Sequence, residues 1–342
     1  MTSYPKVDLG TVFKGSPSGK IVKAQGGQRE LRPQDVVIDI AYSGLCFTDM
    51  HYRKTDMVLG HEGVGVVSQV GSEVKVLKAG DRVGYGYNHD SCGYCDHCLQ
   101  GDDIFCPDNK MYGVSDHDIG GFSDRVVLNA MFVHKIPEEL TLRDVAPMQC
   151  AGVTVYAAIV NAGVTPGSRT GILGVGGLGH LAIQFLNRMG CDVVVFSSTS
   201  SKQDLALKLG ANEFVASREN PAFEGVKKID FLFVSTSAQP DWKEYFPLMN
   251  PDSTIVPLTV GSGDMVHPYE DIVEKQLKIY GSVVGKRYTH RKMLEFAARH
   301  NVRAMIEELP MTEEGLNTAF ERLEKGDVRF RFVLKSQTTD AN

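Results

Sequence analysis

The stretch Thr170-Gly171-Ile172-Leu173-Gly174-Val175-Gly176-Gly177-Leu178-Gly179 decides the fold of this chain. Residues 170–174 form a short apolar run typical of a buried strand, and residues 178–189 have the apolar spacing of a helix. Between them lies a G-x-G-x-x-G motif, whose glycines permit a tight turn and let a pyrophosphate approach the backbone at the helix N-terminus. The motif therefore predicts a dinucleotide site that includes Gly174, Gly176, Gly177, Leu178 and Gly179.

The pattern around this motif predicts an α/β unit. Strands are expected at 192–196, 213–216 and 229–234, with a helix at 203–209, and this alternation continues to about residue 285. Such alternation predicts a parallel sheet with helices on both faces. Before residue 152 the pattern differs, because short apolar runs at 36–40, 63–70 and 82–85 indicate an all-β unit. After residue 286 we expect a helix at 291–300, a helix that opens at 312–314 and a strand at 329–334.

The end of the second strand of the α/β unit indicates which dinucleotide binds. An NAD site places a carboxylate there for the ribose 2′-hydroxyl, whereas this chain has hydroxyl side chains and a lysine. These groups donate hydrogen bonds to a 2′-phosphate and do not repel its charge. NADP(H) is therefore preferred over NAD(H), although a solvated loop is the alternative reading of the same residues. The residues concerned are Ser197, Ser198, Thr199 and Lys202.

Composition limits the class of protein. The 342 residues are 42% hydrophobic and 23% charged, with a net charge of −6 and no Lys/Arg run, so we expect no nucleic-acid partner. Neither a signal-peptide core nor an apolar stretch of membrane-spanning length is found, so we expect no membrane association and a cytoplasmic location with reduced thiols.

Four of the seven cysteines lie within fifteen residues. Their spacing is C-x₂-C-x₂-C-x₇-C, and in a reducing compartment this clustering indicates a metal rather than disulfides. Four thiolates complete a tetrahedral zinc site with no open position, which is typical of a structural zinc that holds a loop together. An iron–sulfur cluster is the alternative for four cysteines. The predicted ligands are Cys92, Cys95, Cys98 and Cys106.

A second, dispersed set is Cys46, His61 and Cys150. Two Cys and one His leave a fourth zinc position for water or substrate, which is the composition of a catalytic site. Spacing alone does not establish such a site, because a single buried cysteine is more often a small hydrophobic residue. Cys191, which begins a strand, is read in that way.

Taken together, these motifs resemble the zinc-containing medium-chain alcohol dehydrogenases, and most of all their NADP-dependent cinnamyl alcohol dehydrogenase-type branch. The resemblance covers essentially the whole chain, because Gly60-His61-Glu62, the four-cysteine loop, Cys150 and the glycine motif occur in the family order. It implies a GroES-like, β-rich catalytic domain made of residues 1–152 and 287–342. It also implies a doubly wound Rossmann cofactor domain at 153–286, two Zn²⁺ per chain, one catalytic and one structural, and a homodimer.

The same resemblance implies individual roles. Cys46, His61 and Cys150 are the implied ligands of the catalytic zinc, and Glu62 lies beside that metal as a transient ligand. Asp49 orients the His61 imidazole, as metal-bound histidines require. Thr48 and His51 form the proton relay, and Gly281 and Ser282 lie near the nicotinamide.

Two departures from the family pattern concern the substrate pocket. The segment 52–59 is shorter than is usual in the family, which predicts a more open pocket, and the segment 85–90 has its own pattern, in which His89 is expected to be exposed. The predicted activity is hydride transfer between NADP(H) and a small-molecule pair, a primary alcohol and its aldehyde, aromatic or of medium size. The alternative is a zinc-containing NADPH reductase of a C=C or C=N bond; a metal-independent reductase and a non-catalytic binding protein are more distant readings.

Overall fold

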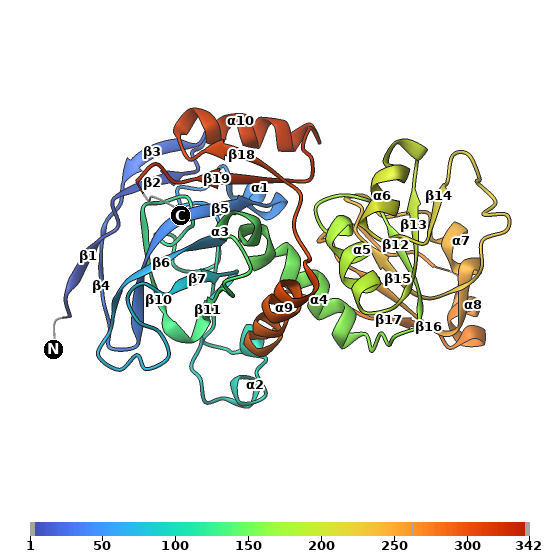
Figure 1. The fold of residues 1–342 in the computed structure, drawn as a ribbon, viewed down its shortest axis with the longest axis horizontal. Coiled ribbons are helices and arrows are strands. Elements are labelled where there is room, and N and C mark those ends of the chain that lie inside the picture. Colours follow the sequence, from blue (N-terminus) through green and yellow to red (C-terminus); the bar gives the residue numbers. More distant parts are fainter. Residues whose placement is uncertain (1–3, 262, 268, 339–342) are drawn as a thin grey trace. The chain divides into compact units, whose positions relative to one another are not determined.

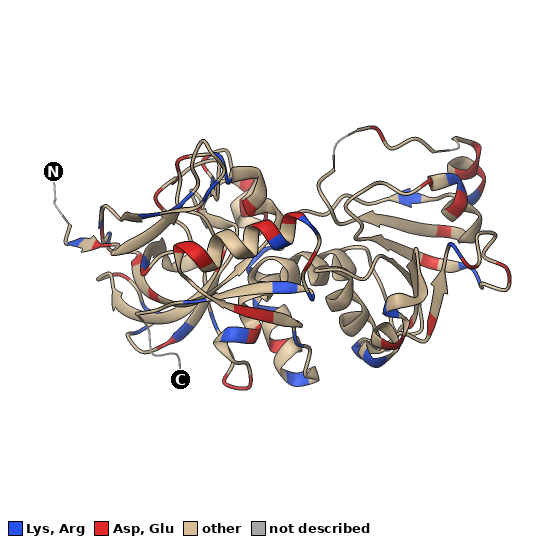
Figure 2. Cartoon of the chain, turned by 90° about the horizontal axis from the view of Figure 1, so that it is seen from above, with Lys and Arg blue, Asp and Glu red and all other residues tan. Residues whose placement is uncertain are grey.

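The computed structural model describes residues 4–261, 263–267 and 269–338, which form two compact units. The first unit contains the chain up to Val153 and again from Lys286, and the second contains Thr154 to Gly285 (Figure 1). None of the helices in the described part of the chain is long and apolar enough to cross a membrane. Cationic and acidic positions are interspersed in each unit (Figure 2).

The second unit is built on one parallel sheet of six strands, in the order β14-β13-β12-β15-β16-β17. Its central strands read as continuous apolar runs because helices cover both faces. This order confirms the predicted Rossmann-type fold. The strands are β12 (Arg169–Leu173), β13 (Asp192–Ser197), β14 (Glu213–Ala216), β15 (Ile229–Val234), β16 (Met249–Pro257) and β17 (Lys278–Ile279). The helices include α5 (Gly179–Arg188), α6 (Gln203–Leu209), α7 (Trp242–Tyr245) and α8 (Tyr269–Lys275), and α4 (Ala151–Asn161) begins before the unit.

The first unit is β-rich and mostly antiparallel. Its main sheet has the order β11-β7-β6-β5-β19-β18, with β10 also paired to β5. Strand β5 (Asp35–Leu45) is long and rich in β-branched residues, so that it pairs with three neighbours and is almost wholly buried. The other strands of this sheet are β6 (Glu62–Val70), β7 (Arg82–Tyr85), β10 (Arg125–Asn129), β11 (Val133–Lys135), β18 (Ile306–Pro310) and β19 (Arg331–Lys335).

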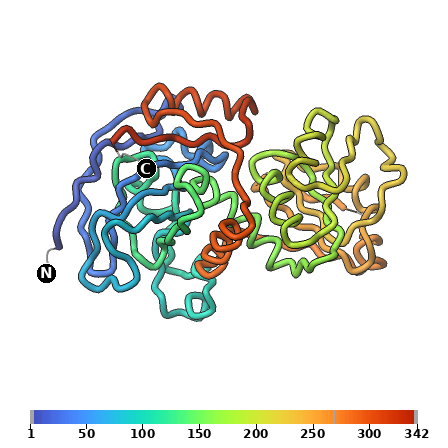
Figure 3. The backbone as a smooth tube through the Cα atoms, viewed as in Figure 1, coloured from blue at the N-terminus to red at the C-terminus, as the bar shows by residue number. Residues whose placement is uncertain are grey.

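The end of the chain returns to complete this unit. Strand β19 pairs antiparallel with β5, with Phe332 opposite Leu45, so the red and blue segments lie side by side in Figure 3. Helix α10 (Glu313–Glu324) begins where the sequence predicted, because the Thr312 hydroxyl accepts a hydrogen bond from the Gly315 N–H at 3.0 Å. The remaining strands and helices of this unit are β1 (Lys6–Asp8), β2 (Thr11–Lys14), β3 (Val22–Gln25), β4 (Gln28–Glu30), β8 (Asn88–Asp90), β9 (Lys110–Met111), α1 (Phe47–Tyr52), α2 (Asp96–Leu99), α3 (Leu142–Val145) and α9 (Arg287–His300).

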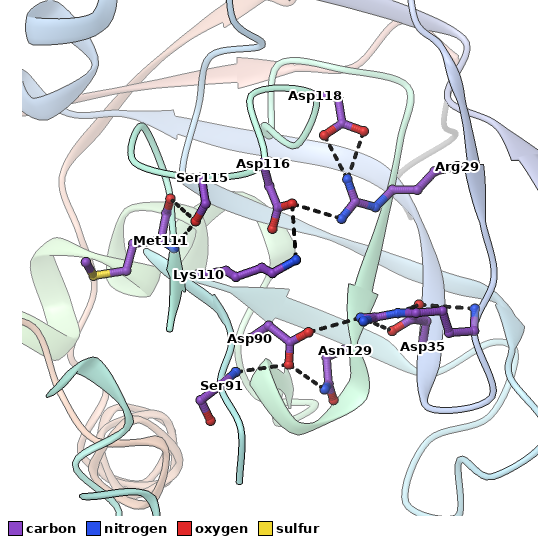
Figure 4. A network of polar contacts seen from close by, with 11 residues as sticks. Arg29, Asp35, Asp90, Ser91, Lys110, Met111, Ser115, Asp116, Asp118 and Asn129 are labelled. Atoms are coloured by element: carbon purple, nitrogen blue, oxygen red, sulfur yellow. Dashed lines mark hydrogen bonds and ion pairs between the residues drawn. The ribbon is translucent and has the colours of Figure 1, made fainter. Parts of the chain in front are cut away.

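The expectation that His89 is exposed is wrong. Its imidazole is 2% exposed, because β8 pairs with β9 and turns the ring inward. Hydrogen bonds and ion pairs of charged side chains connect the β8–β9 pair to the surrounding segments (Figure 4). Asp90 accepts hydrogen bonds from Arg32 at 3.1 Å and from Asn129 at 2.8 Å, which attach β8 to the main sheet.

Candidate functional site

The predicted catalytic ligands converge in the first unit from three separate segments. Cys46 is the N-cap of α1 directly after β5, His61 precedes β6, and Cys150 lies between a 3₁₀ turn (Ala146–Gln149) and α4. Their ligand atoms and one carboxylate oxygen of Glu62 all lie within 4.8 Å of one another. The fold thus gathers two sulfurs, an imidazole and a carboxylate from positions more than a hundred residues apart.

Asp49 fixes the orientation of the His61 ring. Its Oδ1 lies 3.0 Å from His61 Nδ1 and accepts hydrogen bonds from the Tyr112 hydroxyl at 2.7 Å and the Gly60 N–H at 3.2 Å. Its Oδ2 accepts the Cys46 N–H at 2.9 Å. Nδ1 is engaged by Asp49, and the buried Nε2 of His61 has no hydrogen-bond partner among the described residues. Nε2 is therefore available to bind a metal ion together with the sulfurs of Cys46 and Cys150.

This arrangement fits a zinc ion. A buried imidazole nitrogen without a partner beside two thiols is what a Cys₂His site requires, with a carboxylate on the other ring nitrogen. Burial lowers the pKa of His61, but Asp49 and the neighbouring sulfur of Cys46 outweigh it and the net direction is upward. A hydrogen bond shared with Cys150 lowers the pKa of Cys46 well below that of an ordinary thiol.

Arg331 is a part of this site that sequence reasoning missed. The Arg331 guanidinium on β19 donates to Glu62 Oε1, and both side chains are buried. Burial raises the pKa of Glu62 to about 7, although Arg331 opposes that shift. A Cβ at Gly44 would collide with Glu62 Oε2, so a larger residue there would displace the Glu62 carboxylate from its present position. An arginine inside an otherwise apolar strand, with Phe330 and Phe332 on either side, was the signal that could have revealed it.

The predicted relay residues lie on the short helix α1. The Thr48 hydroxyl is 3.7 Å from Cys46 Sγ and is partly buried, whereas His51 is exposed and its ring lies 5.9 Å from that of Phe47. Residues three apart on a helix share a face. Tyr87, partly exposed, presents its ring edge-on to His61 at 5.9 Å and adds an aromatic wall that the sequence did not assign to the site.

The four-cysteine loop also closes on itself. The sulfur atoms of Cys92, Cys95, Cys98 and Cys106 all lie within 4.8 Å of one another, with 3.9 Å between Cys92 and Cys98 and 3.5 Å between Cys95 and Cys98. Four thiolates at the usual zinc–sulfur distance have edges of roughly 3.8 Å. These distances fit a single zinc, since a cluster of several irons holds its cysteine sulfurs farther apart.

The glycine motif of the second unit lies at the carboxyl end of β12. Gly174 has φ of +95°, and a Cβ at Gly179 would collide with the carbonyl of Gly174, so both positions need glycine. Helix α5 begins at Gly179 and directs its N-terminus toward the loop. Ser197 ends β13, and Lys202 Nζ donates to the Val175 carbonyl at 2.8 Å, which brings the predicted 2′-phosphate loop to the glycine motif.

A cavity of about 150 Å³ lies beside this motif. It is lined by the segments that follow β15 and β16, including Thr236, Trp242 and Thr259. Ligands of doubly wound sheets bind at the carboxyl ends of the strands, where this cavity is found. Gly281 and Ser282 follow β17 at the same edge of the sheet, Gly281 exposed and Ser282 partly buried.

Residues 32–138 match the family model described as alcohol dehydrogenase GroES-like domain, and residues 177–299 match the one described as zinc-binding dehydrogenase. A probable formaldehyde dehydrogenase of Bacillus subtilis is 37% identical over 325 residues, which cover 91% of this chain and 93% of that protein. The chain belongs to the zinc-binding alcohol dehydrogenases. This confirms the family resemblance that the sequence motifs carry.

Two further relatives have names that state a cofactor or a branch of the family. An NADP-dependent alcohol dehydrogenase of Mycolicibacterium smegmatis is 35% identical, over 93% of this chain and 95% of that protein. A solved structure of a cinnamyl alcohol dehydrogenase from Sorghum bicolor is 35% identical with a TM-score of 0.89, and the match covers 97% of this chain and 99% of that chain. The roles of the individual side chains and the number of metal ions stay predictions.

Proposed function

We propose that this dehydrogenase interconverts primary alcohols and aldehydes with NADP(H). A catalytic zinc is held by Cys46, His61 and Cys150, and a structural zinc by the four cysteines of residues 92–106. The observation that carries the proposal is the buried Nε2 of His61, which has no hydrogen-bond partner in the described part of the chain and lies beside two sulfurs, with Asp49 on the other ring nitrogen.

The residues of the chain divide the work. A zinc ion held there polarises the substrate oxygen, and the nicotinamide carries the hydride. Asp49 keeps the proton of His61 on Nδ1, so that Nε2 remains a lone-pair donor. The Thr48 hydroxyl exchanges a proton with the substrate oxygen, and exposed His51, one turn along α1, exchanges it with solvent. Arg331 keeps the Glu62 carboxylate close to the ligand set but neutralised.

The preference for NADP(H) rests on the loop after β13. Ser197, Ser198, Thr199 and Lys202 supply donors and a positive charge where an NAD site has a carboxylate. Two relatives are consistent with it: the NADP-dependent enzyme of M. smegmatis and a Helicobacter pylori cinnamyl alcohol dehydrogenase solved with NADP(H), which is 27% identical with a TM-score of 0.86.

The substrate class follows from the site and the relatives. Tyr87 provides an aromatic wall near His61, and the short segment 52–59 predicts a more open pocket, which suits aromatic or medium-sized aldehydes. The alternative, reduction of a C=C or C=N bond, is not favoured, because the relatives named above are alcohol dehydrogenases and because Thr48 and His51, the residues of the proposed carbonyl relay, are both present.

We also propose a homodimer in the cytoplasm. The apolar edge, as we name the exposed side chains that follow β16 and flank β17, leaves one side of the sheet uncovered. It consists of Val260, Val266, Tyr269, Val273, Ile279, Tyr280 and Val283. A second copy of the chain, related by a two-fold axis, would cover this edge.

The test is turnover by purified protein with a panel of aromatic and aliphatic aldehydes, using NADPH and NADH in parallel, together with the zinc content per chain. We expect NADPH oxidation with at least one aldehyde, about two zinc ions per chain, and no turnover by Cys46→Ser. Unchanged turnover by Cys46→Ser would overturn the catalytic zinc assignment. Protein that holds both zincs but reduces no aldehyde would point to C=C or C=N chemistry instead.

A further inference from the structure

The parallel pairing of β13 and β14 brings a second charged segment to the loop proposed for the 2′-phosphate. Ser197 lies opposite Ala216 in this ladder. Beyond it the pairing continues, because the Ser217 N–H donates to the Ser197 carbonyl at 2.8 Å and the Arg218 N–H donates to the Ser198 carbonyl at 3.3 Å. The backbone of Arg218 is therefore fixed beside Ser198.

The charged side chains at this edge differ in whether they have a hydrogen-bond partner within the protein. Lys202 Nζ donates to the Val175 carbonyl at 2.8 Å, and Glu219 Oε1 accepts the Ser200 N–H at 3.3 Å. Arg218 is exposed, and within residues 4–261, 263–267 and 269–338 its guanidinium has neither a hydrogen-bond nor an ion-pair partner. It is a cation held at the edge of a ligand site without an internal counter-charge.

A bound phosphate monoester would provide the counter-charge for both Lys202 and Arg218. At neutral pH such a group carries a charge between about −1.5 and −2, more than a single lysine neutralises. A guanidinium supplies the second charge and a planar pair of donors that matches two phosphate oxygens. We infer that Arg218 binds the 2′-phosphate of NADP(H) and sets the preference for NADPH over NADH. The inference rests on the proposed NADP(H) dependence and adds a residue from the neighbouring strand to it.

A substitution at Glu219 should change the preference for NADPH in the direction opposite to a substitution at Arg218. Its carboxylate lies at the same edge, so its charge opposes a 2′-phosphate. Glu219→Gln keeps an amide oxygen that can accept the Ser200 N–H and removes only the charge. We therefore expect Arg218→Gln to lower the preference for NADPH and Glu219→Gln to raise it.

The experiment measures binding apart from turnover. Calorimetric titration of the zinc-loaded protein with adenosine 2′,5′-bisphosphate and with adenosine 5′-monophosphate isolates the 2′-phosphate. For Arg218→Gln we expect about tenfold weaker binding of the bisphosphate and a change below about twofold for the monophosphate. Arg218→Lys should retain most of the affinity. The matched control is Lys228→Gln, which removes a charge at the opposite, amino edge of the sheet just before β15 and should change neither affinity.

The kinetic counterpart is a higher KM for NADPH in Arg218→Gln, with kcat and the KM for NADH unchanged. If wild-type protein binds the two nucleotides equally, the proposed NADP(H) preference itself fails. If wild type prefers the bisphosphate but Arg218→Gln binds both as wild type does, only the role of Arg218 is overturned. Equal weakening of both nucleotides would also overturn it, because the effect would then not concern the 2′-phosphate.

Discussion

At the scale of single residues, Asp49 organises the candidate zinc site. It accepts hydrogen bonds from two backbone N–H groups and from Tyr112 in addition to its contact with His61. In Asp49→Asn the new NH₂ group would face some of these donors, so the His61 ring would lose its fixed orientation. We expect roughly 10- to 100-fold weaker zinc binding and a corresponding loss of activity, measured by chelator competition and by turnover. Asp56→Asn, in an exposed ion pair with Lys14, is the control. If Asp49→Asn binds zinc as tightly as wild type does, Asp49 does not orient His61 for the metal.

The Glu62–Arg331 pair gives a second prediction at this scale. Both side chains are buried, so Arg331→Met leaves a carboxylate in a low-dielectric site without its cation. We expect a loss of roughly 3–5 kcal/mol in the free energy of unfolding, measured in urea. The double variant with Glu62→Gln should recover much of that loss, because the unpaired charge is then gone. If the single and double variants are equally destabilised, packing rather than charge explains the effect.

Residues that carry a motif could be predicted, and residues brought in by long-range pairing could not. Cys46, His61 and Cys150 stand in distinctive local contexts, and the fold gathers them as expected. Arg331 reaches Glu62 only because β19 pairs with β5 across almost the whole chain, a pairing that no local pattern reveals. The exposure predicted for His89 is wrong for a similar reason, since the burial of this side chain depends on the β8–β9 pairing.

At the scale of elements, the packing of α9 against β11 makes the free energy of unfolding depend on pH. The His290 ring on α9 lies 4.0 Å, centroid to centroid, from the His134 ring on β11, and its Nε2 is 3.0 Å from Gln149 Oε1. Burial lowers the pKa of His290 to about 3 and that of His134 well below its ordinary value. In the unfolded chain both imidazoles titrate near pH 6.5. Between these values the unfolded state binds more protons, so the stability is complete above about pH 6.5 and declines as pH falls.

We therefore expect each buried imidazole to lower the free energy of unfolding by about 1.4 kcal/mol per pH unit below pH 6.5. His290→Gln removes one such group, so its stability should fall less steeply than that of wild type between pH 6.5 and 5. Urea unfolding at several pH values, with zinc held constant, measures the difference. His117→Gln replaces an exposed histidine and should keep the wild-type slope. Parallel slopes for wild type and His290→Gln would contradict the prediction.

The four-cysteine loop also supports an element distant in sequence. Lys286 contacts Asp102 at 2.9 Å, and Arg287 donates to both oxygens of Asp103 at 2.7 and 3.0 Å, so the start of α9 is tied to the segment between Cys98 and Cys106. In Cys106→Ser we expect loss of one zinc and a thermal midpoint lower by about 5–10 °C. Amide exchange should become faster in residues 92–106 and also at the beginning of α9. Faster exchange in the loop alone would show that α9 does not depend on it.

Sequence patterns located the elements of the second unit better than those of the first. The strands β12, β13, β14 and β15 lie within one residue of the expected bounds, because strands buried on both faces stand out as apolar runs. In the first unit, the predicted strand at 36–40 is only part of β5, which continues to Leu45. The segment 86–113 is polar and rich in Cys and Gly, yet it contains β8, α2 and β9, whose formation depends on partners rather than on local pattern.

At the scale of the whole molecule, the apolar edge predicts the state of association. Val260 is 92% exposed, Val266 73% and Tyr269 79%, and among the described strands β17 is paired only to β16, so its other side presents backbone groups that no described strand pairs. Exposed apolar side chains beside an open strand edge are typical of an interface between copies. We expect sedimentation at twice the chain mass of 37.5 kDa for wild type, and at the chain mass for Val273→Lys with Ile279→Lys. Val76→Lys alters a comparably exposed valine of the other unit and should stay dimeric. A wild-type monomer at micromolar concentration would contradict the homodimer. A double-lysine variant that remains dimeric would show that the interface lies elsewhere.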